Sequence, residues 1–430
     1  MEQGWRRQRS ASPSGSGSVV VRKHRPDHLI ALYAGMLMLI GLVLIYAIGP
    51  QRANVLNSVF GYDYSDTYFF VKQLVSFVLA VGSFVFFAML PYKWVTRYAT
   101  QLLILGLLAS VILAIAAWAG LPIVQTANGA TRWFDFGPLG TLQPAEVLKF
   151  GVLAYVAVFL AKKAKEGPVN DWKNTLYPVM AVTSLSLLLI VVVQKDLGTG
   201  IALAAIVFSM LFIAGLSWRN VAVLSGALLV IGLLLIVSAP HRMERVMTYL
   251  QGDSSTTQDD GTYHIQQAKI ALGSGGLFGV GIGESVQASG YLPEAINDSI
   301  FAVFGETFGF VGTMALIVLF VALLMRMLRV MDRLADLRLK LLVAGVFGWF
   351  GAHVILNIAA MIGIFPLTGI TLPLLSYGGT SMVFMTAALG LVYQLSRYTV
   401  HESRIKEETH EDSRSRRGVG RTRNASRRSS

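Results

Sequence analysis

Long apolar runs separated by short polar segments repeat along the whole chain. A helix needs ~20 mostly apolar residues to cross the hydrocarbon core of a bilayer, and ten runs approach that length. The ten runs are Leu29–Gly49, Phe69–Leu90, Leu102–Ala119, Ala145–Ala161, Leu176–Val193, Gly198–Leu216, Val221–Ser238, Ser299–Met325, Leu341–Gly363 and Gly379–Leu395. Membrane β-barrels instead show ~10-residue segments in which apolar and polar residues alternate. The pattern therefore predicts an all-α polytopic membrane protein with about ten transmembrane helices.

The composition agrees with this fold class. Hydrophobic residues make up 54% of the chain and charged residues 14%, with a mean hydropathy of +0.58, whereas soluble domains carry about 25% charged residues. The chain contains no cysteine, which excludes disulfides, thiolate metal sites and a cysteine nucleophile.

The hydropathy pattern divides the chain into a membrane domain and two tails. Residues 29–396 form the predicted ten-helix domain, and a large extracytoplasmic loop is predicted at 239–297, between the seventh and eighth helices, with interfacial helices in it. Residues 1–28 and 397–430 are rich in Arg, Ser and Gly, so we expect disordered basic tails. The first run is too long for the apolar part of a cleavable signal, so it should be retained.

Basic residues are distributed unevenly between the two sides of the predicted membrane. Most of the 36 Lys and Arg lie in the tails or in the loops on the same side as the tails. Basic loops stay in the cytoplasm, so both termini are predicted to be cytoplasmic. The net charge of +12 is then mainly a topology signal, and we expect no nucleic-acid partner.

Charged residues also gather at the opposite, outer ends of the runs. They are Arg132, Glu146, Lys149, Asp196, Lys269, Glu294, Asp298 and Glu306. Charges at the mouth of a membrane span usually face a cavity or pathway. Simpler roles stay open: Glu146 and Lys149 have the spacing of an intrahelical ion pair, and Asp196 and Asp298 stand where a helix N-cap accepts backbone hydrogen bonds.

Two segments rich in glycine and proline interrupt the outer side, at residues 273–298 and 365–381. The first contains neither GxGxxG nor GxxxxGK[ST], so its glycines are predicted to allow close packing or a turn and not to bind a nucleotide. Non-helical backbone at membrane depth is tolerated where it lines a cavity or is buried in protein. The two segments therefore predict a cavity between helices. His353 and Asn357 are predicted to be a buried polar pair, because a zinc motif would need a further ligand.

Five blocks of sequence resemble a known family. They are, in chain order, TRWFDFGPLGTLQPAEVLKF, DLGTG, GSGGLFGVGIGESVQ, YLPEAINDSIFAVFGETFGFVG and FPLTGITLPLLSYGGTS. Together with the ten-run pattern, they are similar to the SEDS family of shape, elongation, division and sporulation proteins. The resemblance implies a peptidoglycan glycosyltransferase that polymerises lipid II at the outer face of the bacterial cytoplasmic membrane and releases polyprenyl pyrophosphate.

The resemblance also implies roles for individual residues. Asp298 falls on the family's catalytic residue, and Arg132, Glu146, Lys149, Asp196, Glu294, Glu306 and Ser376 fall on its polar, substrate-binding cavity. We expect Asp298 to act as a general base, and Arg132, Lys149 and Lys269 to stabilise the pyrophosphate leaving group. A divalent cation, Mg or Mn, is a candidate cofactor, whereas no nucleotide, haem or flavin is expected. Lys195 departs from the family, which usually has Pro there.

The implied partners are the lipid II substrate, a class B penicillin-binding protein and other membrane proteins of the division machinery. The long charged tails and the sequence YFFVKQL at the second run favour the division member of the family, acting at the septum, over the elongation member that controls cell shape. Two further alternatives stay open: a lipid II flippase, since charges at membrane depth and broken helices also suit transport, and a scaffold of a division complex.

Overall fold

The structure is a computed structural model that describes residues 25–399, apart from 128–129, 138–139, 168, 238–242 and 244–259. Most of both predicted tails and part of the loop 239–297 therefore lie outside the described residues. The helices are α1 (His28–Phe60), α2 (Tyr68–Met89), α3 (Tyr92–Arg97), α4 (Ala99–Trp118), α5 (Pro144–Glu166), α6 (Tyr177–Leu187), α7 (Leu197–Ile213), α8 (Trp218–Val237), α10 (Asp260–Ser274), α11 (Ile300–Asp332), α12 (Leu337–Met361) and α13 (Gly379–Leu395).

Each apolar run of the sequence coincides with one of these helices. Within the described part of the chain, seven helices are long and apolar enough to cross a membrane. These are α1, α2, α4, α5, α11, α12 and the helix Trp172–Val193, in which π-helical turns flank α6. Two more, α7 and α8, are shorter apolar helices, and α13 has 17 residues, which corresponds to about 25 Å. The helical membrane fold is confirmed, but the count of ten spans is not.

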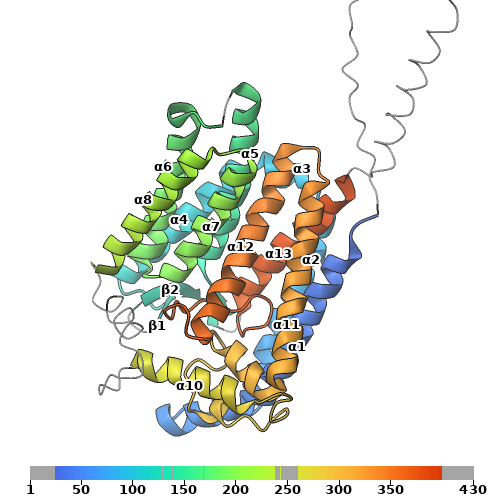
Figure 1. The fold of residues 1–430 in the computed structure, drawn as a ribbon. Coiled ribbons are helices and arrows are strands. Elements are labelled where there is room, and N and C mark those ends of the chain that lie inside the picture. Colours follow the sequence, from blue (N-terminus) through green and yellow to red (C-terminus); the bar gives the residue numbers. More distant parts are fainter. Residues whose placement is uncertain are drawn as a thin grey trace, which may run out of the picture.

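The long helices run roughly parallel, and α10 lies across one end of the bundle (Figure 1). The helices α5 and α12 occupy its centre, since 78% and 72% of their spans are buried, against 17% for α2. Contacts of α5 extend to α4, α7 and α12, and α12 also packs against α11. Charged side chains in the buried part of α5, such as Lys149 and Glu146, are therefore surrounded by protein.

The pairing of α4 with α5 depends on close approach of the two backbones. A Cβ atom at Gly106 would lie 2.5 Å from the Cα atom of Leu148, and one at Gly151 would lie 2.6 Å from the carbonyl oxygen of Leu102. Small residues allow such approach between membrane helices. This contact fixes the first turns of α5, which carry Glu146 and Lys149.

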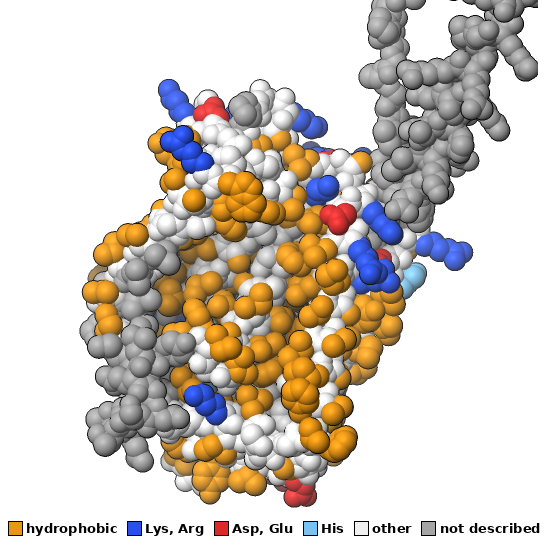
Figure 2. All heavy atoms as spheres, viewed as in Figure 1, with side chains coloured by type: hydrophobic (Ala, Val, Ile, Leu, Met, Phe, Trp, Pro, Cys, Tyr) orange, Lys and Arg blue, Asp and Glu red, His pale blue; other side chains and the backbone are white. Residues whose placement is uncertain are grey.

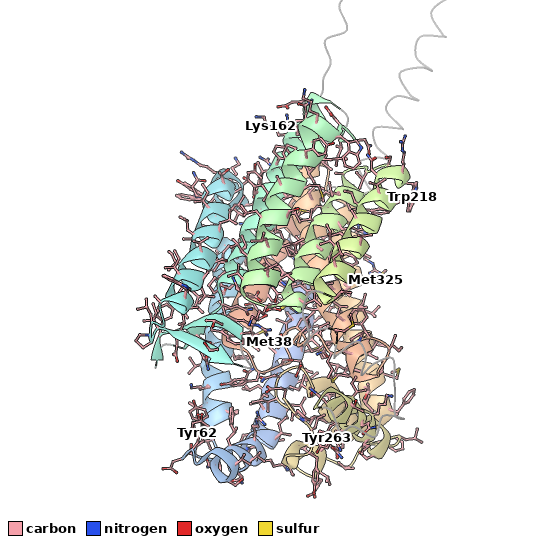
Figure 3. The ribbon with its side chains drawn as sticks, turned by 90° about the vertical axis from the view of Figure 1, so that its left-hand side faces the viewer. Met38, Tyr62, Lys162, Trp218, Tyr263 and Met325 are labelled. Carbon is pink, nitrogen blue, oxygen red and sulfur yellow. The ribbon has the colours of Figure 1, made fainter. Side chains whose placement is uncertain are left out.

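The two ends of the bundle differ in character. Figure 3 places Lys162 and Trp218 toward one end and Tyr62 and Tyr263 toward the other. We call these the Lys162 end and the Tyr263 end. Hydrophobic side chains dominate the surface between them, and most of the visible Lys and Arg lie toward the Lys162 end (Figure 2).

A small sheet, which lies between α4 and α5 in the sequence, adjoins these two helices above α10, on the side of them that faces the Tyr263 end (Figure 1). Strands β1 (Val124–Ala127), β2 (Ala130–Asp135) and β3 (Thr141–Leu142) pair antiparallel in the order β1-β2-β3. These strands were not predicted from the sequence. A hairpin signal was present, because Asn-Gly at 128–129 is typical of a two-residue connection between strands.

Candidate active site

Asp298 lies in a tight turn immediately before α11. The backbone N–H groups of Asn297 and Ser299 donate to the carbonyl of Glu294 at 2.9 and 3.2 Å, and Glu294 has a φ of +49°, which is uncommon for a residue other than glycine. The N-cap of α11 is Ser299, with no side-chain capping bond. The interpretation of Asp298 as the N-cap is therefore wrong, because the turn places it one residue too early.

The Asp298 turn is attached to α12. Asn357 donates from Nδ2 to the carbonyls of Asp298 and Ile370, each at 2.7 Å, and His353 Nδ1 lies 3.2 Å from the carbonyl of Thr371. Asn357 and His353 are 1% and 3% exposed. This confirms the predicted buried polar pair, whose bonds hold the Asp298 turn and the segment 365–381 on one face of α12.

Glu146 and Lys149 form an ion pair in the first turns of α5. Lys149 Nζ lies 2.8 Å from Glu146 Oε1, and their side chains are 0% and 2% exposed. Lys149 Nζ also lies 4.6 Å from the ring centroid of Trp349, one helical turn before His353 on α12. The predicted ion pair is confirmed, and its burial distinguishes it from an exposed helical pair; a substrate-binding role for either residue stays a prediction.

Asp196 lies at the start of α7 and contacts the residue that precedes α5. It is the N-cap of α7, where its carboxylate accepts from Thr199 N at 3.0 Å and Thr199 Oγ1 at 2.9 Å, which confirms the capping interpretation. Gln143, the residue before α5, donates from Nε2 to Asp196 Oδ2 at 3.2 Å. The carboxylate thus joins the start of α7 to the start of α5.

Arg132 on β2 contacts the same region through uncharged groups. Its Nε and Nη2 donate to the carbonyls of Gln194 and Lys195 at 3.3 and 2.8 Å. Carbonyls do not neutralise a guanidinium, so Arg132 keeps a positive charge that suits a phosphate. Lys195 has a φ of +53°, a conformation that proline cannot adopt.

Glu306 anchors the glycine-rich segment to α11. Its carboxylate accepts from Ser285 Oγ at 2.5 Å and from Val286 N and Gln287 N at 3.1 and 3.3 Å, and it is 1% exposed. All of these partners belong to the segment 285–287. The contacts assign Glu306 a structural role, and binding of substrate by it stays a prediction.

The glycine-rich segment lies directly against the first turns of α11. A Cβ atom at Gly275 would lie 2.1 Å from the carbonyl oxygen of Gly305, and Val280 N donates to the carbonyl of Glu306 at 2.9 Å. Helix α11 itself is kinked at Gly309, where φ is +66°. The predicted role of these glycines in close packing is confirmed.

The remaining predicted residues lie around this core. Glu294 is in contact with Arg52 of α1, with 3.9 Å between Arg52 Nη2 and Glu294 Oε1. Lys269 on α10 is exposed, and its side chain lies against Gly363. Ser376 is 5% exposed, and its hydroxyl accepts from Leu372 N at 2.8 Å, which places it inside a turn.

Several residues that organise the site were not predicted. Gln143 bonds to Asp196 and Ser285 to Glu306, while Trp349 covers Lys149. His264 Nε2 of α10 lies 2.5 Å from Ser299 Oγ. The Ser299 hydroxyl in turn donates to the carbonyl of Pro293. Neutral polar or aromatic residues of this kind are common in any sequence, so no pattern singled them out.

The candidate metal site was tested on the described residues. No group of three or more His, Cys, Asp or Glu among them is arranged to hold a metal ion. Asp196 and Glu306 accept hydrogen bonds from N–H and O–H donors, and Glu146 is paired with a cation. The described residues therefore contain no preformed metal centre of this kind, and the candidate cation stays a prediction.

Comparison with known proteins assigns the family. The model of the FtsW/RodA/SpoVE family, described as cell cycle proteins, matches residues 27–401. The chain belongs to this family. It is 32% identical over 382 residues to stage V sporulation protein E of Bacillus subtilis (strain 168), covering 89% of this chain and 100% of the relative.

Two further proteins are similar to this chain. A probable peptidoglycan glycosyltransferase FtsW of Nitrosomonas europaea is 32% identical over 391 residues, covering 89% of this chain and 95% of the relative. One solved structure shows the structural coordination of polymerization and crosslinking by a peptidoglycan synthase complex. A chain of that complex is 26% identical to this chain and superposes with a TM-score of 0.65. The match covers 86% of this chain and 98% of the solved chain. The SEDS resemblance and its fold are confirmed.

Proposed function

We propose that this peptidoglycan glycosyltransferase polymerises lipid II into glycan strands at the outer face of the bacterial cytoplasmic membrane, with release of polyprenyl pyrophosphate. The Tyr263 end would be the outer face. The observation that carries the proposal is the placement of Asp298, which is 9% exposed and whose backbone is held by Asn357, beside the first turn of α11. Similarity to a probable peptidoglycan glycosyltransferase supports it.

The chemistry assigns Asp298 the role of general base. Its carboxylate takes the proton of a sugar hydroxyl, the hydroxyl oxygen bonds to the anomeric carbon of a second lipid-linked sugar, and the bond from that carbon to the pyrophosphate oxygen breaks. Positioned bases typically contribute 10²–10⁴-fold to a rate. Negative charge develops on the departing pyrophosphate, and a cation fixed nearby stabilises it. Arg132 is suited to this because its bonded carbonyls leave its charge unneutralised.

The test is polymerisation of lipid II by purified protein in detergent, with glycan chains separated on a gel. We expect Asp298→Asn to lower the rate by about 10²–10⁴-fold. The control is Asp135→Asn at the same end of the bundle, because Asp135 is exposed and accepts a backbone hydrogen bond from Gly137 that an asparagine oxygen also accepts. We expect this control to polymerise like the wild type.

The same assay separates the alternatives. A flippase or a pure scaffold would make no glycan in detergent, where transport across a bilayer has no meaning. Wild-type rates from a folded Asp298→Asn protein would show that another group is the base. Addition of a chelator tests whether the candidate cation, Mg or Mn, takes part.

The partner that we propose is a class B penicillin-binding protein, with other division proteins at the septum. Similarity to a chain of a peptidoglycan synthase complex supports a partner of this kind, and similarity to a probable FtsW supports the division role over the elongation role.

A further inference from the structure

A stack of tyrosines projects from the loop between α1 and α2. The rings of Tyr62 and Tyr64 are stacked with centroids 5.0 Å apart, and those of Tyr64 and Tyr68 are stacked at 4.2 Å. Tyr62, at the end of the stack, is 52% exposed and lies toward the Tyr263 end (Figure 3). We call Tyr62, Tyr64 and Tyr68 the tyrosine ladder.

The tyrosine ladder is held rigidly by its neighbours. Asn57 of α1 forms two hydrogen bonds with the backbone of Tyr64. Asn57 Nδ2 donates to the carbonyl of Tyr64, and the N–H of Tyr64 donates to Asn57 Oδ1, both at 2.9 Å. Lys72 Nζ lies 4.8 Å from the centroid of Tyr68. Desolvation and the neighbouring tyrosines raise the pKa of Tyr64, so its hydroxyl stays protonated at neutral pH. The tyrosines are uncharged, and because the stacked rings cover one another's inner faces, a ligand would meet the exposed Tyr62 and the ring edges.

Aromatic contacts continue from the ladder toward Asp298. Tyr68 meets Phe69 edge-on at 5.2 Å, and Phe69 meets Tyr377 edge-on at 5.6 Å. The backbone N–H of Tyr377 donates to the carbonyl of Ile296 at 2.8 Å, two residues before Asp298. Ring contacts therefore lead from the exposed Tyr62 through the buried Phe69 to Tyr377, whose backbone is bonded to the turn that carries the candidate base.

The chemistry of the ladder fits a carbohydrate. A pyranose ring has a face of C–H bonds that packs on the electron-rich face of an aromatic ring, and its hydroxyls donate to carboxylates. Asp63 and Asp66 alternate with the tyrosines in the sequence Tyr62-Asp63-Tyr64-Ser65-Asp66, and both are exposed. Large aromatic surface with a few polar groups is the usual composition of a small-molecule site.

We propose that the tyrosine ladder binds the growing glycan strand and guides it away from the Asp298 turn. This inference rests on the proposed function, since the strand is the product of that reaction. Binding of the strand would keep it near the enzyme between additions, so the ladder would raise the number of sugars added before release. The competing role is that of an interfacial aromatic belt, in which tyrosines sit among lipid headgroups.

The experiment uses the full-length protein in detergent and has two readouts. One is the affinity for a soluble hexamer of β-1,4-linked N-acetylglucosamine, measured by NMR titration, and it requires no catalysis. The other is the length of glycan chains made from lipid II. We expect Tyr62→Ala to weaken hexamer binding by about 3- to 10-fold, which is the range for one aromatic contact, and to shorten the chains. We expect Tyr62→Trp to restore both, because it keeps the aromatic face.

Tyr263→Ala is the matched control, because Tyr263 is 37% exposed at the same end of the bundle, on α10 (Figure 3). It should change neither readout. Hexamer binding by Tyr62→Ala equal to that of the wild type would overturn the inference, and so would equal losses in both variants, which a general interfacial role predicts. Failure of the wild type to polymerise would count against the proposed function, while hexamer binding would still test the ladder.

Discussion

At the scale of single residues, burial determines how much an ion pair matters for stability. The spacing of Glu146 and Lys149 predicted an ion pair, but an identical spacing joins Lys163 to Glu166 on the same helix at 2.9 Å. The side chains of the Glu146–Lys149 pair are 0–2% exposed, whereas those of the Lys163–Glu166 pair are 26–47% exposed. Removing one partner of a buried pair leaves an uncompensated charge, whereas exposed pairs contribute little.

This contrast gives a prediction for stability. Lys149→Met should destabilise the protein by about 3–5 kcal/mol, because Glu146 is then left buried without its cation. Lys163→Met should leave the melting temperature within experimental error. Thermal unfolding of both variants in the same detergent measures the difference, and equal melting temperatures would show that the buried pair does not stabilise the fold.

At the scale of elements, the site depends on a segment without regular structure. Residues 275–287 are held against α11 by the carboxylate of Glu306 and by backbone hydrogen bonds such as that from Phe310 N to the carbonyl of Gly276, at 2.9 Å. Such contact requires that no side chain stands between the two backbones. The position of the Asp298 turn therefore depends on glycines that lie outside it.

Two neighbouring glycines test this dependence. Gly275→Ala should cost about 1–3 kcal/mol through overpacking, because its Cβ would lie 2.1 Å from the carbonyl oxygen of Gly305, and polymerisation should fall with it. Gly273→Ala has nothing within 4 Å of the new Cβ, so it should be neutral or slightly stabilising, since alanine favours a helix by up to about 1 kcal/mol. Melting temperatures and polymerisation rates of the two variants are the measurements. Similar losses of stability and rate in Gly275→Ala and Gly273→Ala would contradict the packing explanation.

At the scale of the whole molecule, the two ends of the bundle define the membrane orientation. The start of α1 meets the end of α13, where Asp27 N donates to Ser396 Oγ at 2.9 Å and Arg326 lies 3.5 Å from Asp27. In Figure 1 this contact is at the end opposite α10. The described ends of the chain thus share one side, and the basic residues predict that this side is cytoplasmic.

The absence of cysteine from the chain makes the orientation easy to test. We expect Gln125→Cys, at the sheet, to react with a membrane-impermeant maleimide in intact spheroplasts, and Lys165→Cys to react only after the membrane is opened. Both positions are exposed, so access to the reagent should depend on the membrane alone. Labelling in the reverse pattern would place the termini outside.

The sequence alone was sufficient for the helices and for the family. A run of ~20 apolar residues cannot leave its backbone unpaired in a bilayer, so hydropathy determines where helices form. The five blocks identified the family, because their order along the chain is specific. Local spacing also correctly predicted the Asp196 cap and the Glu146–Lys149 pair.

Only the tertiary structure decided how these residues are held. The hydrogen bond from Asn357 to Asp298 joins residues 59 positions apart, and that from Gln143 to Asp196 joins residues 53 apart. Neither leaves a local pattern in the sequence, because the partners are brought together by helix packing. Asp298 lies one residue before the N-cap because of a turn in which two backbone N–H groups bond to the carbonyl of Glu294. Local periodicity determined the helices, and long-range contacts determined the site.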